Sequence, residues 1–164
     1  MHRLTLLRAL ALAALAHVAG ATQAQETYAD PHGRFVTPVP PGWSTEATPD
    51  VVTFRRTGPD GVLHVLAPIG EEQRVLTSAL AMLFDPPFDP AFAAAPLQAT
   101  PAALPSGVWT QRIYLVGDEI LAALTLERGD HTVLVLAKAT QAAFVQAVND
   151  AVNQVVAGLE VLIP

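Results

Sequence analysis

Residues 33–43, Gly-Arg-Phe-Val-Thr-Pro-Val-Pro-Pro-Gly-Trp, join a short strand to a rigid turn at the start of the predicted fold. Alternate residues of a strand point to opposite faces, so three side chains of residues 34–39 should point into the core, namely Phe35, Thr37 and Val39. The prolines in this stretch have no amide proton, which predicts an edge strand or the last residues of one. Gly42 then allows the turn, and Trp43 is the first large apolar residue after it.

Residues 1–24 have the pattern of a secretory signal peptide. Basic residues precede an apolar run over residues 9–19, and small residues follow it, which predicts cleavage after Ala21 or Ala24. The run is shorter than the roughly 20 residues of a membrane-spanning helix, so a retained anchor is the weaker alternative. The chain has no cysteine to carry a lipid anchor. The mature protein is therefore predicted to be exported, periplasmic or extracellular, and not embedded in the membrane.

The charge balance argues against nucleic acid as a partner. Cleavage would remove Arg3 and Arg8, which lowers Lys+Arg from 9 to 7 against 15 Asp+Glu and takes the formal net charge from -6 to -8. Lys138 is the only lysine. Proteins that follow a phosphate backbone need clustered Lys and Arg, which this chain lacks. The absence of cysteine also excludes disulfides, thiolate metal sites and a cysteine nucleophile.

Hydrophobic periodicity predicts a hairpin and a helix in the first half of the chain. Strands over residues 51–57 and 62–69 flank Gly-Pro-Asp-Gly, which is typical of a hairpin turn. A helix then runs from Glu71 to near Phe84. Its apolar residues recur at helical spacing and form one buried stripe, consisting of Val75, Leu76, Ala79, Leu80 and Leu83.

The second half of the chain predicts a meander and a last helix. Strands over 108–116, 120–127 and 132–138 have short connections, so they should pair antiparallel, and the third is apolar on both faces and therefore central. Thr140 should cap a helix that ends near Gly158, before an extended tail over residues 159–163. The buried stripe of this helix comprises Phe144, Val148, Ala151, Val152, Val155, Val156 and Leu159.

These elements predict one α+β domain over residues 28–163. Its antiparallel sheet should have about six or seven strands, with two main helices packed on it. The length leaves no room for a second domain of ordinary size.

A proline-rich segment over residues 85–107 separates the two halves. Its prolines predict neither a long helix nor a paired strand. Long loops in compact domains are often functional, and this one carries three large apolar residues, Phe88, Phe92 and Leu97. They either fold back as a lid on the sheet or form an exposed patch that binds a partner.

The chain resembles the Mog1/PsbP-like superfamily in the order of its elements, in Asp-Pro-His-Gly-Arg-Phe over residues 30–35 and in Val-Pro-Pro-Gly-Trp over 39–43. More narrowly, it is similar to small exported bacterial domains, some of which resemble a segment ahead of the catalytic domain of secreted serine hydrolases. The resemblance implies a central antiparallel sheet with helices packed on it, and a role in binding or assembly. Members bind partners as different as a small GTPase and a photosystem, so the fold does not select a function.

Residue types that carry chemistry occur outside the contexts that activate them. The mature serines lie outside Gly-x-Ser-x-Gly and Ser-x-x-Lys motifs, and they are Ser44, Ser78 and Ser106. The mature histidines lack the i, i+4 spacing of a helical metal site, although a site assembled in three dimensions stays open, and they are His32, His64 and His131. The acidic pairs over 71–72 and 118–119 suit a helix start and a turn. We therefore predict no catalytic residue, cofactor or metal site.

The sequence supports a non-catalytic binding or accessory domain that acts at the cell envelope through a protein partner or a small ligand. The alternative is an enzyme of unrecognised type with a pocket under residues 85–107. A third interpretation is self-association through the predicted edge strand at residues 34–39. The identity of the ligand or partner and the oligomeric state stay open.

Overall fold

A computed structural model describes residues 25–58, 60–85 and 87–164. The predicted signal peptide, residues 1–24, lies outside these residues. In chain order the elements are β1 (Thr27–Ala29), β2 (Phe35–Pro38), β3 (Trp43–Ala47), β4 (Val51–Arg56), β5 (Gly61–Leu66), α2 (Glu72–Leu83), α3 (Pro90–Ala93), β6 (Gln98–Leu104), β7 (Gly107–Val116), β8 (Glu119–Arg128), β9 (His131–Thr140), α4 (Gln141–Ala143), the π-helical turn η2 (Phe144–Val148), α5 (Asn149–Gly158) and β10 (Glu160–Val161).

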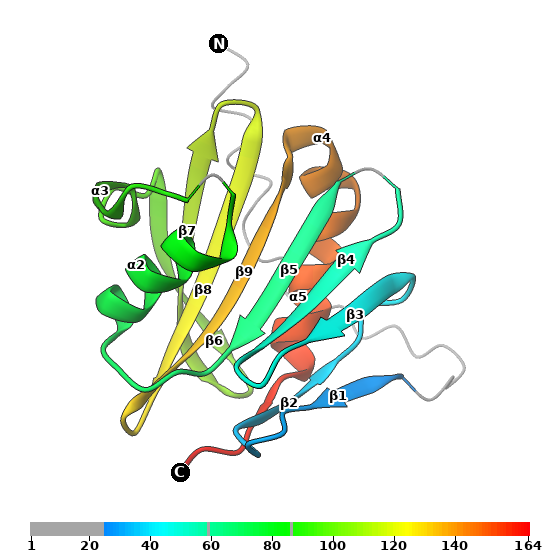
Figure 1. Cartoon of the computed structure of the whole chain (residues 1–164), viewed down its shortest axis with the longest axis vertical. Coiled ribbons are helices and arrows are strands. Elements are labelled where there is room, and N and C mark those ends of the chain that lie inside the picture. The colour runs from blue at the N-terminus through cyan, green and yellow to red at the C-terminus, as the bar shows by residue number, and fades with distance from the viewer. Residues whose placement is uncertain (1–24, 59, 86) are drawn as a thin grey trace.

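A seven-stranded antiparallel sheet forms the centre of the molecule, with strand order β3-β4-β5-β9-β8-β7-β6 (Figure 1). The predicted meander is confirmed, because β7, β8 and β9 pair in succession. Gly117 and Gly129 open its two turns at φ 64 and 57, a conformation in which glycine has no side-chain clash. The apolar strand β9 lies between β5 and β8, and its residues 132–137 are buried, as a central strand requires.

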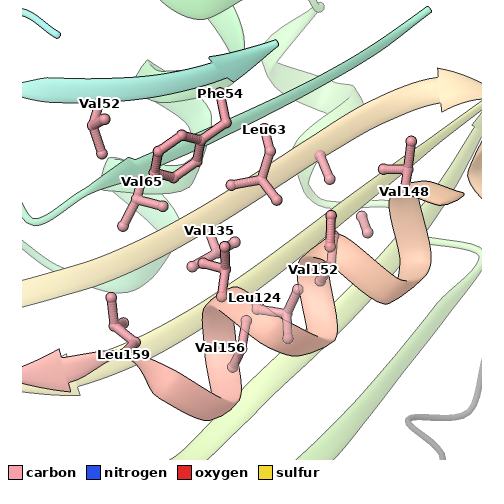
Figure 2. Packing of buried hydrophobic residues seen from close by; sticks show 14 of the residues in the cluster. Val52, Phe54, Leu63, Val65, Leu124, Val135, Val148, Val152, Val156 and Leu159 are labelled. Atoms are coloured by element: carbon pink, nitrogen blue, oxygen red, sulfur yellow. The ribbon is translucent and has the colours of Figure 1, made fainter. Parts of the chain in front are cut away.

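Helices cover both faces of this sheet (Figure 1). Alternation divides the buried side chains of β8 into two clusters, with Leu124 on the α5 face and Leu121 on the α2 face. Figure 2 shows Val152 and Val156 of α5 against the sheet residues Leu124 and Val135. The predicted α+β fold with two main helices on an antiparallel sheet is confirmed.

The two helical stripes are buried as the periodicity predicts. In α2 the residues Val75, Leu76, Ala79 and Leu80 are buried, and Leu83 packs against them. The last helix runs through α4, η2 and α5, and the hydroxyl of Thr140 accepts a hydrogen bond from the amide of Ala143 at its start. No helix within the described part of the chain is both long enough and apolar enough to cross a bilayer.

The strand at the start of the domain does not form an edge, and this prediction was wrong. Phe35 and Thr37 point inward as expected, but β2 lies between β1 and β10 in a separate three-stranded sheet. Proline is tolerated because Pro38 is the last residue of β2, and β10 pairs only with Phe35 and Val36. Since β1 pairs along one side of β2 and β10 along the first half of the other, β2 does not offer the free edge on which self-association was predicted.

The proline-rich segment is more regular than its composition predicts. Residues 98–104 form β6, which pairs with β7 over its whole length, so the prediction of no paired strand was wrong. The strand tolerates Pro101 because it is at the edge of the sheet, where only one side needs amide donors. The short helix α3 begins with Pro90, and Asp89 caps it by accepting a hydrogen bond from the amide of Ala91 at 2.8 Å.

Candidate functional site

The predicted binding residues of the proline-rich segment separate in the structure. Phe88 and Phe92 are partly buried and stack on each other, with ring centroids 5.0 Å apart. Leu97 lies away from this stack and is half exposed. The two phenylalanines therefore occupy the position of a lid on the sheet, whereas Leu97 faces solvent.

Phe88 and Phe92 belong to a longer row of aromatic rings. The stack continues to Tyr114 on one side, at 4.9 Å, and to Phe84 on the other, at 5.3 Å. The Tyr114 hydroxyl donates to the carbonyl of Ala93 at 3.0 Å, which ties α3 to β7. These contacts therefore anchor the proline-rich segment to the α2 face of the sheet.

Two of the serine and histidine candidates, Ser106 and His64, have structural partners, whereas Ser78, His32 and His131 line a groove beside α2. The Ser106 hydroxyl accepts a hydrogen bond from the indole of Trp109 at 2.9 Å. His64 is buried, and its Nδ1 lies 2.9 Å from the Thr53 hydroxyl. Burial, assisted by the charge of Arg55, lowers the pKa of His64 to about 4. No group of three or more His, Cys, Asp or Glu side chains among the described residues is placed to hold a metal ion.

The acidic candidates also have structural partners. Glu72 accepts a hydrogen bond from Arg112 at 2.7 Å and another from the hydroxyl of Thr125. Burial raises the pKa of Glu72, but the hydrogen bonds and charge of Arg112 outweigh it, so the pKa lies below the usual value. Glu119 forms an ion pair with Lys138 at 3.0 Å. The lowered pKa of Glu72 favours its charged form, which does not suit a general acid.

A groove of about 910 Å³ runs beside α2, and it is the site that we consider functional. One wall is the helical row at i, i+4 and i+8, formed by Arg74, Ser78 and Met82. Another wall combines the turn over residues 32–34 with the tail over 162–164. The amide of Leu162 donates to the carbonyl of Arg34 at 2.9 Å, which joins the two parts of this wall.

Apolar side chains line the groove and are accessible to solvent. Its floor includes Val75 and Ala79, which belong to the buried stripe of α2. Around it lie three exposed apolar residues, Ile69, Met82 and Leu162, which are 66%, 74% and 46% exposed. Contiguous apolar surface of this kind marks interaction sites in soluble proteins.

Sequence reasoning missed this site. One signal was present, because Met82 is an apolar residue outside the buried stripe of its helix. The other exposed residues, Ile69 and Leu162, lie after the ends of strands. There the alternation of apolar and polar residues no longer indicates which way a side chain points. The sequence also does not show that the tail returns beside α2.

A buried ion pair shapes the turn at one end of the groove. Asp30 accepts hydrogen bonds from the backbone amides of His32 and Arg34, and it binds the Arg34 guanidinium through both carboxylate oxygens, at 2.7 and 2.8 Å. Burial raises the pKa of Asp30, but the hydrogen bonds from Arg34 outweigh burial and hold the pKa below its usual value. The turn is therefore fixed by a charged aspartate.

Comparisons with solved structures identify the fold. The chain is similar to the cyanobacterial PsbP protein CyanoP from Synechocystis sp. PCC 6803, with 17% identity and a TM-score of 0.55 over 90% of this chain and 98% of that one. It is also similar to the Ran-binding protein Mog1p of Saccharomyces cerevisiae, with 10% identity and a TM-score of 0.53 over 87% of this chain and 97% of that one.

A protein from Bacteroides thetaiotaomicron VPI-5482 gives a TM-score of 0.53 at 13% identity, over 85% of this chain and 49% of that one. No family model and no curated protein sequence matches the chain. These similarities confirm the fold that the resemblance predicted, whereas the narrower resemblance to hydrolase-associated domains stays a prediction. The chain has the Mog1/PsbP-like α+β fold.

Proposed function

We propose that this chain is an exported, non-catalytic accessory domain of the cell envelope that binds a protein partner through the groove beside α2. The observation that carries the proposal is the row of exposed apolar residues around the groove, Ile69, Met82 and Leu162. Similarity in fold to a Ran-binding protein supports protein binding as the type of activity. The ion pairs that hold Glu72 and Glu119 support a non-catalytic role.

Site-specific photocrosslinking in living cells tests the groove. A benzoylphenylalanine at Met82 should give one discrete adduct with a partner, because this side chain lies at the groove and is exposed. The matched control is Val145, which is 51% exposed and belongs to η2 of the last helix. Equal adducts from both positions, or none from Met82, would contradict the proposal. Hydrolytic turnover by the purified protein would contradict its non-catalytic part.

Export is tested by the N-terminus of the protein recovered from the envelope fraction. Cleavage after Ala21 or Ala24 predicts a mature chain that begins at Thr22 or Gln25. Intact-mass measurement distinguishes the two. Recovery of the chain with residues 1–24 attached, in the cytoplasmic fraction, would contradict export.

A further inference from the structure

The charges around the groove are not equally neutralised. Two arginines and one aspartate line it, Arg34, Arg74 and Asp50, together with His32, His131 and Pro164. Arg34 is held by Asp30 at 2.7 Å and lies 3.8 Å from Asp50. Its positive charge is therefore matched within the protein, whereas for Arg74 no carboxylate of residues 25–58, 60–85 or 87–164 lies within ion-pair distance.

The Arg74 guanidinium lies next to the backbone that precedes α2. Gly70 has φ +142 and lies against the guanidinium so closely that a β-carbon at position 70 would overlap its Nη2. Gly70 is itself anchored, because its amide donates to the carbonyl of Asp130 at 2.8 Å and its carbonyl accepts from the Thr132 hydroxyl at 2.7 Å. The guanidinium of Arg74, which has no carboxylate of the described residues within ion-pair distance, therefore lies on the groove wall beside an anchored stretch of backbone in an otherwise acidic protein.

The shape of the groove favours a peptide over a small apolar molecule. Pockets for small ligands enclose most of the ligand surface, whereas Met82 and Leu162, which both line this groove, are exposed. The row from Arg74 to Met82 spans eight helical steps, or about 12 Å at 1.5 Å per residue. An extended peptide covers this length with about four residues at roughly 3.3 Å each.

On the basis of the proposed function, we infer that the groove binds an extended segment of the partner protein. This segment combines aliphatic side chains with one Asp or Glu. The carboxylate pairs with Arg74. The aliphatic side chains lie between Met82 and Leu162, over the floor formed by Val75 and Ala79. An arginine and a carboxylate form the stronger, charge-assisted class of hydrogen bond, so Arg74 contributes to both affinity and choice of partner.

A random peptide library displayed on phage tests the inference with the purified protein as bait. The selected peptides should be enriched in aliphatic residues next to Asp or Glu. For one selected peptide, synthesised with a fluorescent label, Arg74→Gln should weaken binding about tenfold, as expected for one hydrogen bond between charged groups. Replacing the acidic residue of the peptide by its amide should give the same loss, and combining both changes should add little.

Two variants separate the inference from the proposed function. Arg56→Gln removes the same charge outside the groove and should leave peptide affinity unchanged. Met82→Glu should abolish binding by placing a negative charge on the apolar wall. One outcome would overturn the inference but leave the groove as a binding site. In it, the selected peptides show no enrichment in Asp or Glu, and their binding is weakened by Met82→Glu but not by Arg74→Gln. Peptides insensitive to both variants, or no enrichment at all, would overturn the inference, and crosslinking at Met82 would then decide the proposed function.

Discussion

On the α5 face of the sheet, large side chains such as Phe54, Trp109 and Phe144 are fully buried in one apolar cluster. The α2 face has a smaller apolar cluster and also carries ion pairs, Glu72 with Arg112 and Glu119 with Lys138. Its aromatic stack is only partly buried at Phe88 and Phe92. The two helices therefore cover their faces to different extents, and the groove lies beside the helix that covers less.

This difference indicates a division of roles between the faces. A closely packed apolar layer stabilises the fold but offers no accessible surface. Polar groups on the α2 face need partners when they are partly buried, and each pair limits how closely α2 can pack. Four substitutions test whether the α5 face carries most of the stability.

The largest effect is expected for Phe54→Ala on the α5 face. Phe54 is 0% exposed, so the substitution leaves a cavity in the larger cluster. The free energy of unfolding should fall by about 3 to 5 kcal/mol. Urea unfolding followed by circular dichroism measures this loss. A loss below about 1 kcal/mol would show that the α5 face is not the main source of stability.

The next effect concerns His64, which is buried on the α2 face beside Phe84. Its pKa of about 4 lies below that of an unfolded histidine, so the unfolded chain binds a proton that the native state does not. Stability should therefore fall by roughly 3 kcal/mol as the pH drops from about 6.5 to about 4.

His64→Leu should remove this contribution to the pH dependence, measured by unfolding at several pH values. An NMR titration of the imidazole gives an independent check. A midpoint for His64 near about 6.5 would show that the α2 face admits water at this position.

A smaller effect is expected for Glu72→Gln, which weakens the pairing with Arg112. Because the pKa of Glu72 is lowered in the native state, the charged carboxylate stabilises the fold above the usual glutamate pKa, and this contribution is lost as the pH falls through the native value. At neutral pH the substitution should cost about 1.5 to 3 kcal/mol.

The matched control for this change is Glu71→Gln, which removes the same charge from an exposed neighbouring residue. It should have little effect on urea unfolding. Equal costs for the two substitutions would mean that net charge, rather than the pair with Arg112, explains the result.

The smallest effect is expected for Phe92→Leu in the aromatic stack. The side chain stays apolar, but the stacked contacts with Phe88 and Tyr114 are lost. Such contacts contribute about 0.5 to 1.5 kcal/mol beyond burial, so the loss should be about 1 kcal/mol in thermal unfolding. A cost near that of Phe54→Ala would show that the stack belongs to the structural core.

Sequence patterns correctly predicted the elements that form through interactions between residues close together in the sequence. The stripe of α2, the meander of β7 to β9 and the cap at Thr140 all follow from local spacing or local hydrogen bonding. The two errors arose at prolines. Composition shows that Pro38 and Pro101 lack a donor, but it does not show whether a neighbouring strand needs one there.

The sequence by itself determined which face of each helix and strand is apolar, because side-chain direction follows the helical and strand periods. Only the tertiary structure decided that the turn at 32–34, the row from Arg74 to Met82 and the tail at 162–164 enclose one groove. These segments meet because β10 pairs with β2, a contact between residues more than a hundred positions apart. No local pattern encodes such a pairing, since it depends on how the whole chain closes around the sheet.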